Sequence, residues 1–202
     1  MSTRLKILKE AGIMFSRHGI RSVTMDAIAV QLGMSKRTIY ENFKDKDDLL
    51  LHSIEAGVDF HKKIVNDIVA KSANVIEAFY SISQQNCEMF EKINPSFFED
   101  LERHHPKINK IVHEQSDLGN QELIRQMIEK GTEEGVFMSD LNIEIVYYMF
   151  YTFIKSINHG PITDSKYDRE EIFYNTFGIL LRGLCTPKGI EIIDEIRSKN
   201  NK

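Results

Sequence analysis

Apolar residues recur at three- and four-residue steps along the whole chain, and this spacing constrains the fold more than any other feature. A half-buried strand would place them at every second position, and no segment reads that way. The four prolines mark joints between helices, because proline is excluded from helix interiors; they are Pro95, Pro106, Pro161 and Pro187. The sequence therefore predicts an all-α protein of about nine or ten helices.

Residues suited to helix ends divide this periodic pattern into segments. Thr24 and Ser35 are N-cap residues, Gly19 and Gly33 end helices, and Asp45 with Asp48 opens a long one. The expected segments are 3–18, 24–33, 35–43, 45–70, 73–93, 96–105, 107–118, 121–134, 141–158, 168–185 and 188–199.

Length and cysteine content indicate a fold without covalent or metal cross-links. A chain of 202 residues can bury about 70% of its unfolded surface, which is sufficient for a stable core. Cys87 and Cys185 each stand in an apolar periodic stretch, which favours two buried free thiols in a reducing compartment. No run of 18 apolar residues and no secretory leader is evident, so we expect a cytoplasmic protein with no membrane partner.

Charge is distributed unevenly along the chain. Residues 1–44 carry eight Lys/Arg and three Asp/Glu, a net charge of +5, whereas the remainder carries −9. A basic head on an acidic body suggests that a polyanion binds to the head alone, although charge by itself is also compatible with chance.

The stretch from Thr24 to Phe43 contains two short helices joined by a turn at Gly33. Helices of this length are stable only when they pack on each other and on a third helix. Ile28, Leu32, Ile39 and Phe43 supply apolar anchors, while the rest of the second helix is rich in hydrogen-bond donors. A helix inserted in the major groove of DNA needs such a face, and the alternative is a plain helical hairpin with a solvated basic surface.

The segment from Ile7 to Leu51 resembles the TetR family of bacterial transcriptional regulators. The resemblance rests above all on the string Thr38-Ile39-Tyr40, followed by Phe43, Lys46 and Leu49. It implies a helix-turn-helix DNA-binding domain over residues 1–46 and a helical ligand-binding and dimerisation domain over 47–202. It also implies a set of DNA-contacting residues: Thr24, Ser35, Lys36, Arg37, Thr38, Tyr40, Asn42 and Lys46.

The resemblance assigns roles within this set. Thr24 and Lys46 would bind phosphates, and the first turn of the second helix, which contains Arg37, would face the groove floor. Asn42 departs from the aromatic residue or histidine common in the family. Glu41 is also unexpected: it would accept from a cytosine, pair with Lys44 or point to solvent.

The helices expected at 141–158 and 168–185 are apolar around more than one face. One face can pack on the protein's own core, and a second copy can cover the other in a two-fold four-helix interface. The alternative is central burial in a monomer. We expect a homodimer whose interface includes Val146, Phe150, Phe173, Phe177, Leu180 and Leu184.

A cavity for a small-molecule effector is expected in the larger domain, although each residue suggested for it is, taken alone, better explained as plain core. The predicted set is Phe79, Asn86, Phe90, Phe98, Leu101, Val112, Met127 and Phe150. No cofactor, metal site or catalytic residue is predicted, since His104 and His105 are adjacent and form a poor chelate.

Together these features predict a ligand-responsive, DNA-binding transcriptional regulator that is not an enzyme. We expect a repressor that binds a palindromic operator of double-stranded DNA as a dimer and is released by a small hydrophobic molecule. The alternatives are an all-helical interaction protein or an enzyme that uses the helical cavity.

Overall fold

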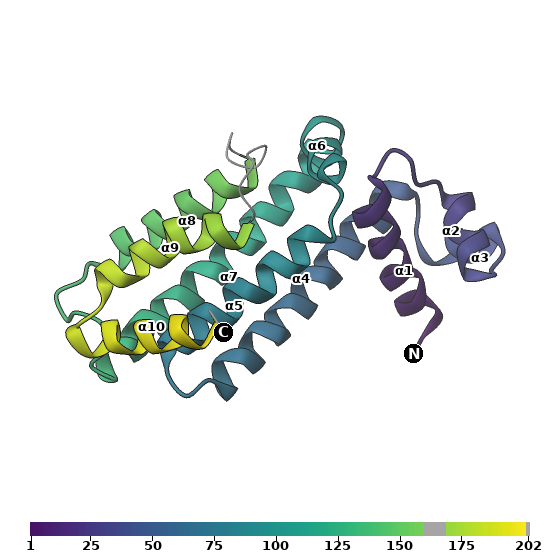
Figure 1. Ribbon diagram of the computed structural model, residues 1–202. Coiled ribbons are helices and arrows are strands. Elements are labelled where there is room, and N and C mark those ends of the chain that lie inside the picture. The colour runs from purple at the N-terminus through teal and green to yellow at the C-terminus, as the bar shows by residue number, and fades with distance from the viewer. Residues whose placement is uncertain (160–168, 201–202) are drawn as a thin grey trace. The chain divides into compact units, whose positions relative to one another are not determined.

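A computed structural model describes residues 1–159 and 169–200. For residues 115–120, 153–159, 169, 170, 173 and 200 it describes the backbone alone. Over this range the chain is all-α, as predicted, and its one β-type pairing is an isolated bridge between Phe137 and Cys185. Figure 1 shows the helices: α1 (Thr3–His18), α2 (Met25–Leu32), α3 (Lys36–Asn42), α4 (Lys46–Lys71), α5 (Val75–Glu91), α6 (Pro95–His104), α7 (Pro106–Glu133), α8 (Ile143–His159), α9 (Arg169–Leu184) and α10 (Pro187–Asn200).

The helix boundaries follow the predicted punctuation with one correction. Pro95, Pro106 and Pro187 are each the first residue of a helix, where the missing N–H costs nothing. Pro161 lies outside the described residues. The segments expected at 107–118 and 121–134 form the single helix α7, because an interior glycine such as Gly119 costs only about 1 kcal/mol and does not break a helix.

The chain forms two compact units. Unit 1 comprises Met1–Asn66 and Glu88–Leu118, and unit 2 comprises Asp67–Cys87 and Gly119–Lys202. Helices α4, α5 and α7 each contribute residues to both units. This is a division by contacts, and the functional boundary expected between residues 46 and 47 stays a prediction.

Unit 1 is built around a core to which α1, α2, α3, α4, α6 and α7 all contribute. Its fully buried side chains include Phe15, Ile28, Ile39 and Leu49. At the start of α4, Asp45 Oδ1 accepts from the Asp48 backbone N–H at 2.9 Å. This is the helix-opening pair that the sequence predicts, and it satisfies one of the unpaired amides of the first turn.

Two hydrogen bonds donated by backbone N–H groups connect α6 to α1 within unit 1. The Asn94 N–H donates to Ser16 O at 2.7 Å, and Asp100 Oδ2 accepts from the Arg21 N–H at 2.9 Å. Gly19, the C-cap of α1, lies next to Ser96 and Asp100 of α6 and has φ 82° and ψ 154°. A Cβ at Gly19 would displace Ser96 Oγ, and the positive φ is the main reason that this junction requires glycine.

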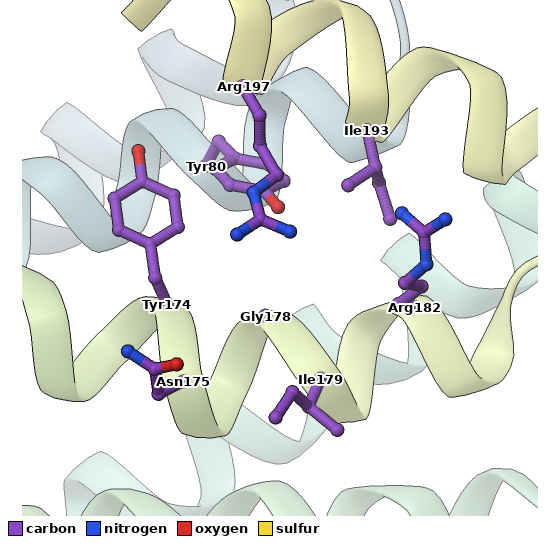
Figure 2. Close-up of a pocket in the computed structure, with 8 residues that line it drawn as sticks. All are labelled: Tyr80, Tyr174, Asn175, Gly178, Ile179, Arg182, Ile193 and Arg197. Carbon is purple, nitrogen blue, oxygen red and sulfur yellow. The ribbon is translucent and has the colours of Figure 1, made fainter. Parts of the chain in front are cut away.

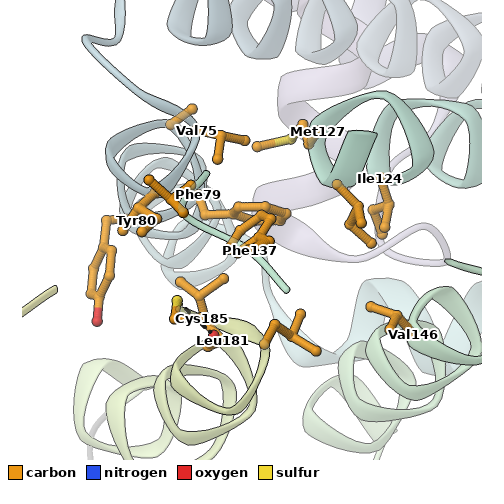
Figure 3. Packing of buried hydrophobic residues seen from close by; sticks show 14 of the residues in the cluster. Val75, Phe79, Tyr80, Ile124, Met127, Phe137, Val146, Leu181 and Cys185 are labelled. Atoms are coloured by element: carbon orange, nitrogen blue, oxygen red, sulfur yellow. Dashed lines mark hydrogen bonds between the residues drawn. The ribbon is translucent and has the colours of Figure 1, made fainter. Parts of the chain in front are cut away.

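Unit 2 has an aromatic core. The rings of Phe79 and Phe150 lie 5.9 Å apart between centroids, and those of Phe150 and Phe177 lie 4.9 Å apart. Phe137 packs against Phe79 from the segment after α7, as Figure 3 shows. The core therefore joins helices α5, α8 and α9 across long sequence separations.

Candidate nucleic-acid interface

Backbone hydrogen bonds at the C-terminus of α2 fix the turn between α2 and α3. Gly33 adopts the left-handed conformation, with φ 62° and ψ 31°. Its N–H donates to Val30 O at 3.1 Å, and the Met34 N–H donates to Ala29 O at 2.9 Å. This is the Schellman pattern, which satisfies the last carbonyls of α2 and reverses the chain.

Side-chain caps begin both helices. Thr24 Oγ1 accepts from the Ala27 N–H at 3.1 Å, and Ser35 Oγ accepts from the Thr38 N–H at 3.1 Å. Ser35 Oγ also lies 2.8 Å from Thr38 Oγ1. The predicted roles of Thr24 and Ser35 as N-caps are thus confirmed, and the Thr24 hydroxyl hydrogen remains able to donate to a phosphate.

The buried side of α3 fixes its orientation on the rest of unit 1. Ile39 is completely buried, and Ile28 of α2 and Phe43 after α3 are buried with it, as predicted. Leu32 is half-buried at the edge of the same core. Because α3 has only seven residues, this packing and not intrinsic helix propensity holds it in place.

The opposite face of α3 is exposed and cationic. The Arg37 side chain is 87% exposed, and its Nε donates to Glu41 Oε1 at 2.9 Å. Lys36 Nζ lies 2.7 Å from Asp26 Oδ1 of α2, and this contact raises the pKa of Lys36. Tyr40 lies on the same face, with Lys36 Nζ 6.0 Å from its ring centroid.

Asn42 is held by its own helix and by α1. Its side-chain Nδ2 donates to Thr38 O at 2.8 Å, and its backbone carbonyl oxygen accepts from Arg4 Nη1 at 2.6 Å. The Arg4 guanidinium also lies 4.3 Å from the ring centroid of Phe43. One amide hydrogen of half-buried Asn42 is thus engaged by its own helix, which restricts the reach predicted for it toward DNA.

Lys46, the first residue of α4, is half-buried. Its Nζ lies 6.0 Å from the ring centroid of Phe15. Burial lowers the pKa of Lys46, and the nearby carboxylates of Asp100 and Asp47 oppose that shift. The ammonium group of Lys46 is therefore less accessible to a ligand than the charged groups of Lys36 and Arg37 on α3.

This geometry agrees with a known family. Residues 7–52 match the family model for bacterial regulatory proteins of the tetR family. Over this segment the chain is similar to TetR-family regulators. It is a DNA-binding transcriptional regulator, and its relatives are named as regulators rather than enzymes.

Relatives extend the similarity beyond the N-terminal helices. The HTH-type transcriptional repressor KstR2 of Mycobacterium tuberculosis is 24% identical over 160 residues, which cover 72% of this chain and 74% of KstR2. A TetR-family regulator from Cytophaga hutchinsonii shares the fold with a TM-score of 0.74 at 14% identity, over 91% of this chain and 95% of that one. AibR, solved with isovaleryl coenzyme A and operator DNA, has a TM-score of 0.59 at 16% identity over 89% of this chain and 96% of that one.

The residues predicted to line an effector cavity are divided between the units. Leu101 and Val112 pack in the core of unit 1, and the rings of Phe90 and Phe98 lie 6.1 Å apart between centroids. Three others pack in the core of unit 2, namely Phe79, Met127 and Phe150, whereas Asn86 is half-buried. As a set they stay a prediction.

The residues predicted for the dimer interface lie mostly within the chain's own core. Val146, Phe150, Phe177 and Leu184 are buried there, and Leu180 packs against that core. Phe173 lies outside the described side chains, and the interface set as a whole stays a prediction. Among the described side chains of α8 and α9, the exposed large apolar residues are Ile145, Tyr148, Met149 and Ile179.

Two contacts near α3 were missed by sequence reasoning, namely those of Arg4 and Asp26. The signal for Arg4 was its position on the cationic first helix, but its partner Asn42 is 38 residues away. Within the described residues, no helix is long and apolar enough to cross a membrane, and no group of three metal-binding side chains is found.

Proposed function

We propose that this TetR-family regulator binds a two-fold operator as a homodimer, represses transcription and is released by a small hydrophobic effector. The observation that carries the proposal is the exposed face of α3, where Arg37 projects from a short helix anchored by buried Ile39. Arginine can bind guanine O6 and N7 through two parallel hydrogen bonds, which contribute about 1–3 kcal/mol of base discrimination.

The remaining contacts of the proposed interface are supported by position. Lys36, Thr38 and Tyr40 are on or beside the exposed face of α3, and Thr24 caps the N-terminus of α2. A helix N-terminus with free donors favours phosphate. We assign Asn42 and Lys46 to phosphate contacts at the edge of the interface, because both are half-buried.

A two-fold operator is bound by two copies of the chain, one for each half-site. Two recognition helices related by a two-fold axis must lie about 34–36 Å apart to enter successive major grooves. In unit 2, α8 and α9 expose Ile145, Tyr148, Met149 and Ile179. Large apolar side chains gathered on two helices favour contact with a second copy of the chain.

Repression and effector release are supported by the names of the relatives. KstR2 is named a transcriptional repressor, and AibR is described in complex with isovaleryl coenzyme A and operator DNA. Helix α4 contributes residues to both units, so an effector that shifts α4 would alter the spacing of the two recognition helices. The first compound to test is isovaleryl coenzyme A, whose isovaleryl group is a small hydrophobic moiety.

The test is a binding-site selection from a pool of random DNA fragments. The region upstream of the protein's own gene is added to the pool as a defined fragment. Arg37→Ala should relax base preference within each half-site and leave the melting temperature unchanged. Arg103→Ala is the matched control, because Arg103 is exposed on α6 of the same unit and outside the predicted contact set. If Arg37→Ala selects the wild-type operator with equal stringency, α3 does not read bases through Arg37.

A further inference from the structure

Helices α5, α9 and α10 of unit 2 enclose a cleft of about 210 Å³ (Figure 2). None of its lining residues belongs to the predicted effector set. The side chains that give it chemical character are two phenols, two guanidinium groups and two aliphatic groups: Tyr80, Tyr174, Arg182, Arg197, Ile179 and Ile193.

The two arginines have different electrostatic states. Arg182 forms a fork-like pair with Asp194, with Nη1 to Oδ1 at 2.5 Å and Nη2 to Oδ2 at 3.3 Å. Asp194 therefore compensates the charge of Arg182 directly. Arg197 also helps to lower the pKa of Asp194, but within the described part of the chain no hydrogen bond or ion pair engages its guanidinium, which extends from α10 toward α9 near Gly178 in Figure 2.

The phenol groups lie beside this guanidinium. The rings of Tyr80 and Tyr174 are 5.9 Å apart between centroids. Burial raises the pKa of Tyr80, and the positive charge of Arg197 opposes the shift, which shows that the two groups sense each other. Tyr80 therefore keeps its proton at neutral pH and can donate a hydrogen bond to an anion.

Volume limits the size of a ligand. A space of 210 Å³ corresponds to about seven water molecules at ~30 Å³ each. This volume fits a compact molecule with one charged group. Ile179 and Ile193 provide apolar contact for the body of such a molecule.

We propose that this cleft binds a small organic carboxylate, with the carboxylate on Arg197 and the apolar body against Ile179 and Ile193. A guanidinium presents two parallel N–H groups that match a carboxylate, and the neighbouring phenols can add further donors. The site is separate from DNA recognition and from the effector cavity predicted for this chain, so it stands whether or not the proposed function does.

The test measures benzoate binding to the full chain by calorimetry in the absence of DNA, with benzamide and inorganic phosphate as companion probes. Arg197→Gln should weaken benzoate binding by about tenfold or more, because a hydrogen-bonded charge is lost. Lys199→Gln removes the same charge from the same exposed end of α10 and should leave the affinity unchanged.

The outcomes separate the proposal from its competitors. Benzoate binding that weakens in Arg197→Gln alone, together with no binding of benzamide, supports a carboxylate site. Equal binding of benzamide and benzoate would overturn it, as would phosphate binding without benzoate binding or an unaltered affinity in Arg197→Gln. The melting temperature of each variant verifies that it is folded.

Discussion

The Nε of Arg37 donates to Glu41 Oε1 at 2.9 Å, one turn along the exposed face of α3. From the sequence, three roles were expected for Glu41: contact with a base, pairing with Lys44 or exposure to solvent. The structure gives it a different partner, the residue proposed to read guanine. The pair engages only Nε of Arg37, and it places a negative charge close to the proposed contact with guanine.

Glu41→Gln should tighten operator binding by about threefold or more at constant salt. An exposed pair of this spacing contributes only about 0.3–0.5 kcal/mol, so stability should change little while a negative charge near the phosphates is removed. Fluorescence anisotropy on labelled operator DNA measures the effect. Glu102→Gln, an identical change at an exposed position of α6, is the control. Weaker binding by Glu41→Gln would show that Glu41 itself contacts a base.

Gly19→Ala should destabilise the chain more than Gly33→Ala. Gly33 is in the left-handed helical region with open space around it, so alanine there costs about 1–2 kcal/mol. Gly19 has a conformation that is almost exclusive to glycine, and a Cβ would also displace Ser96 Oγ. Urea unfolding compares the two variants, and equal losses would show that the α1–α6 junction yields without cost.

Tyr148→Asp should convert the proposed dimer to a folded monomer. Tyr148 is 70% exposed on α8, so a charge there is solvated in the monomer but unpaired in an apolar interface. Sedimentation velocity at about 10 μM, with Ser198→Asp on α10 as the control, reads the state directly. Phe177→Asp should unfold unit 2 instead, because Phe177 is buried in its core. A monomeric wild type would refute the dimer.

Cys185 should be nearly inert toward thiol reagents. It is buried, its Sγ donates to Leu181 O at 3.2 Å, and burial raises its pKa from 9.0 to about 11. At pH 8 the thiolate fraction is then about a hundredfold lower than for an ordinary thiol. Cys87→Ser isolates Cys185, and its reaction with a disulfide reagent should be about a hundredfold slower in the folded chain than in guanidinium chloride. Comparable rates would mean that the site opens readily.

Residue type alone is sufficient to predict the local features of the helix-turn-helix segment. Thr24, Gly33 and Ser35 act on backbone groups within a few residues, so their roles as caps and turn were predictable from residue type. The burial of Ile39 was equally predictable, since its spacing from the anchors of α2 allows only one packed face. The prolines at the starts of α6, α7 and α10 belong to the same class of local signals.

Tertiary packing, and not the local pattern, selects which apolar side of α8 and α9 meets the chain's own core. Helices α8 and α9 are apolar around most of their circumference, so periodicity could not distinguish Phe177, which is buried, from Ile179, which is 63% exposed. The same limit hid the pairing of Arg4 with Asn42 and the meeting of Tyr80 with Arg197 across α5 and α10. Such contacts depend on how distant segments pack together, and no short-range pattern in the chain encodes that choice.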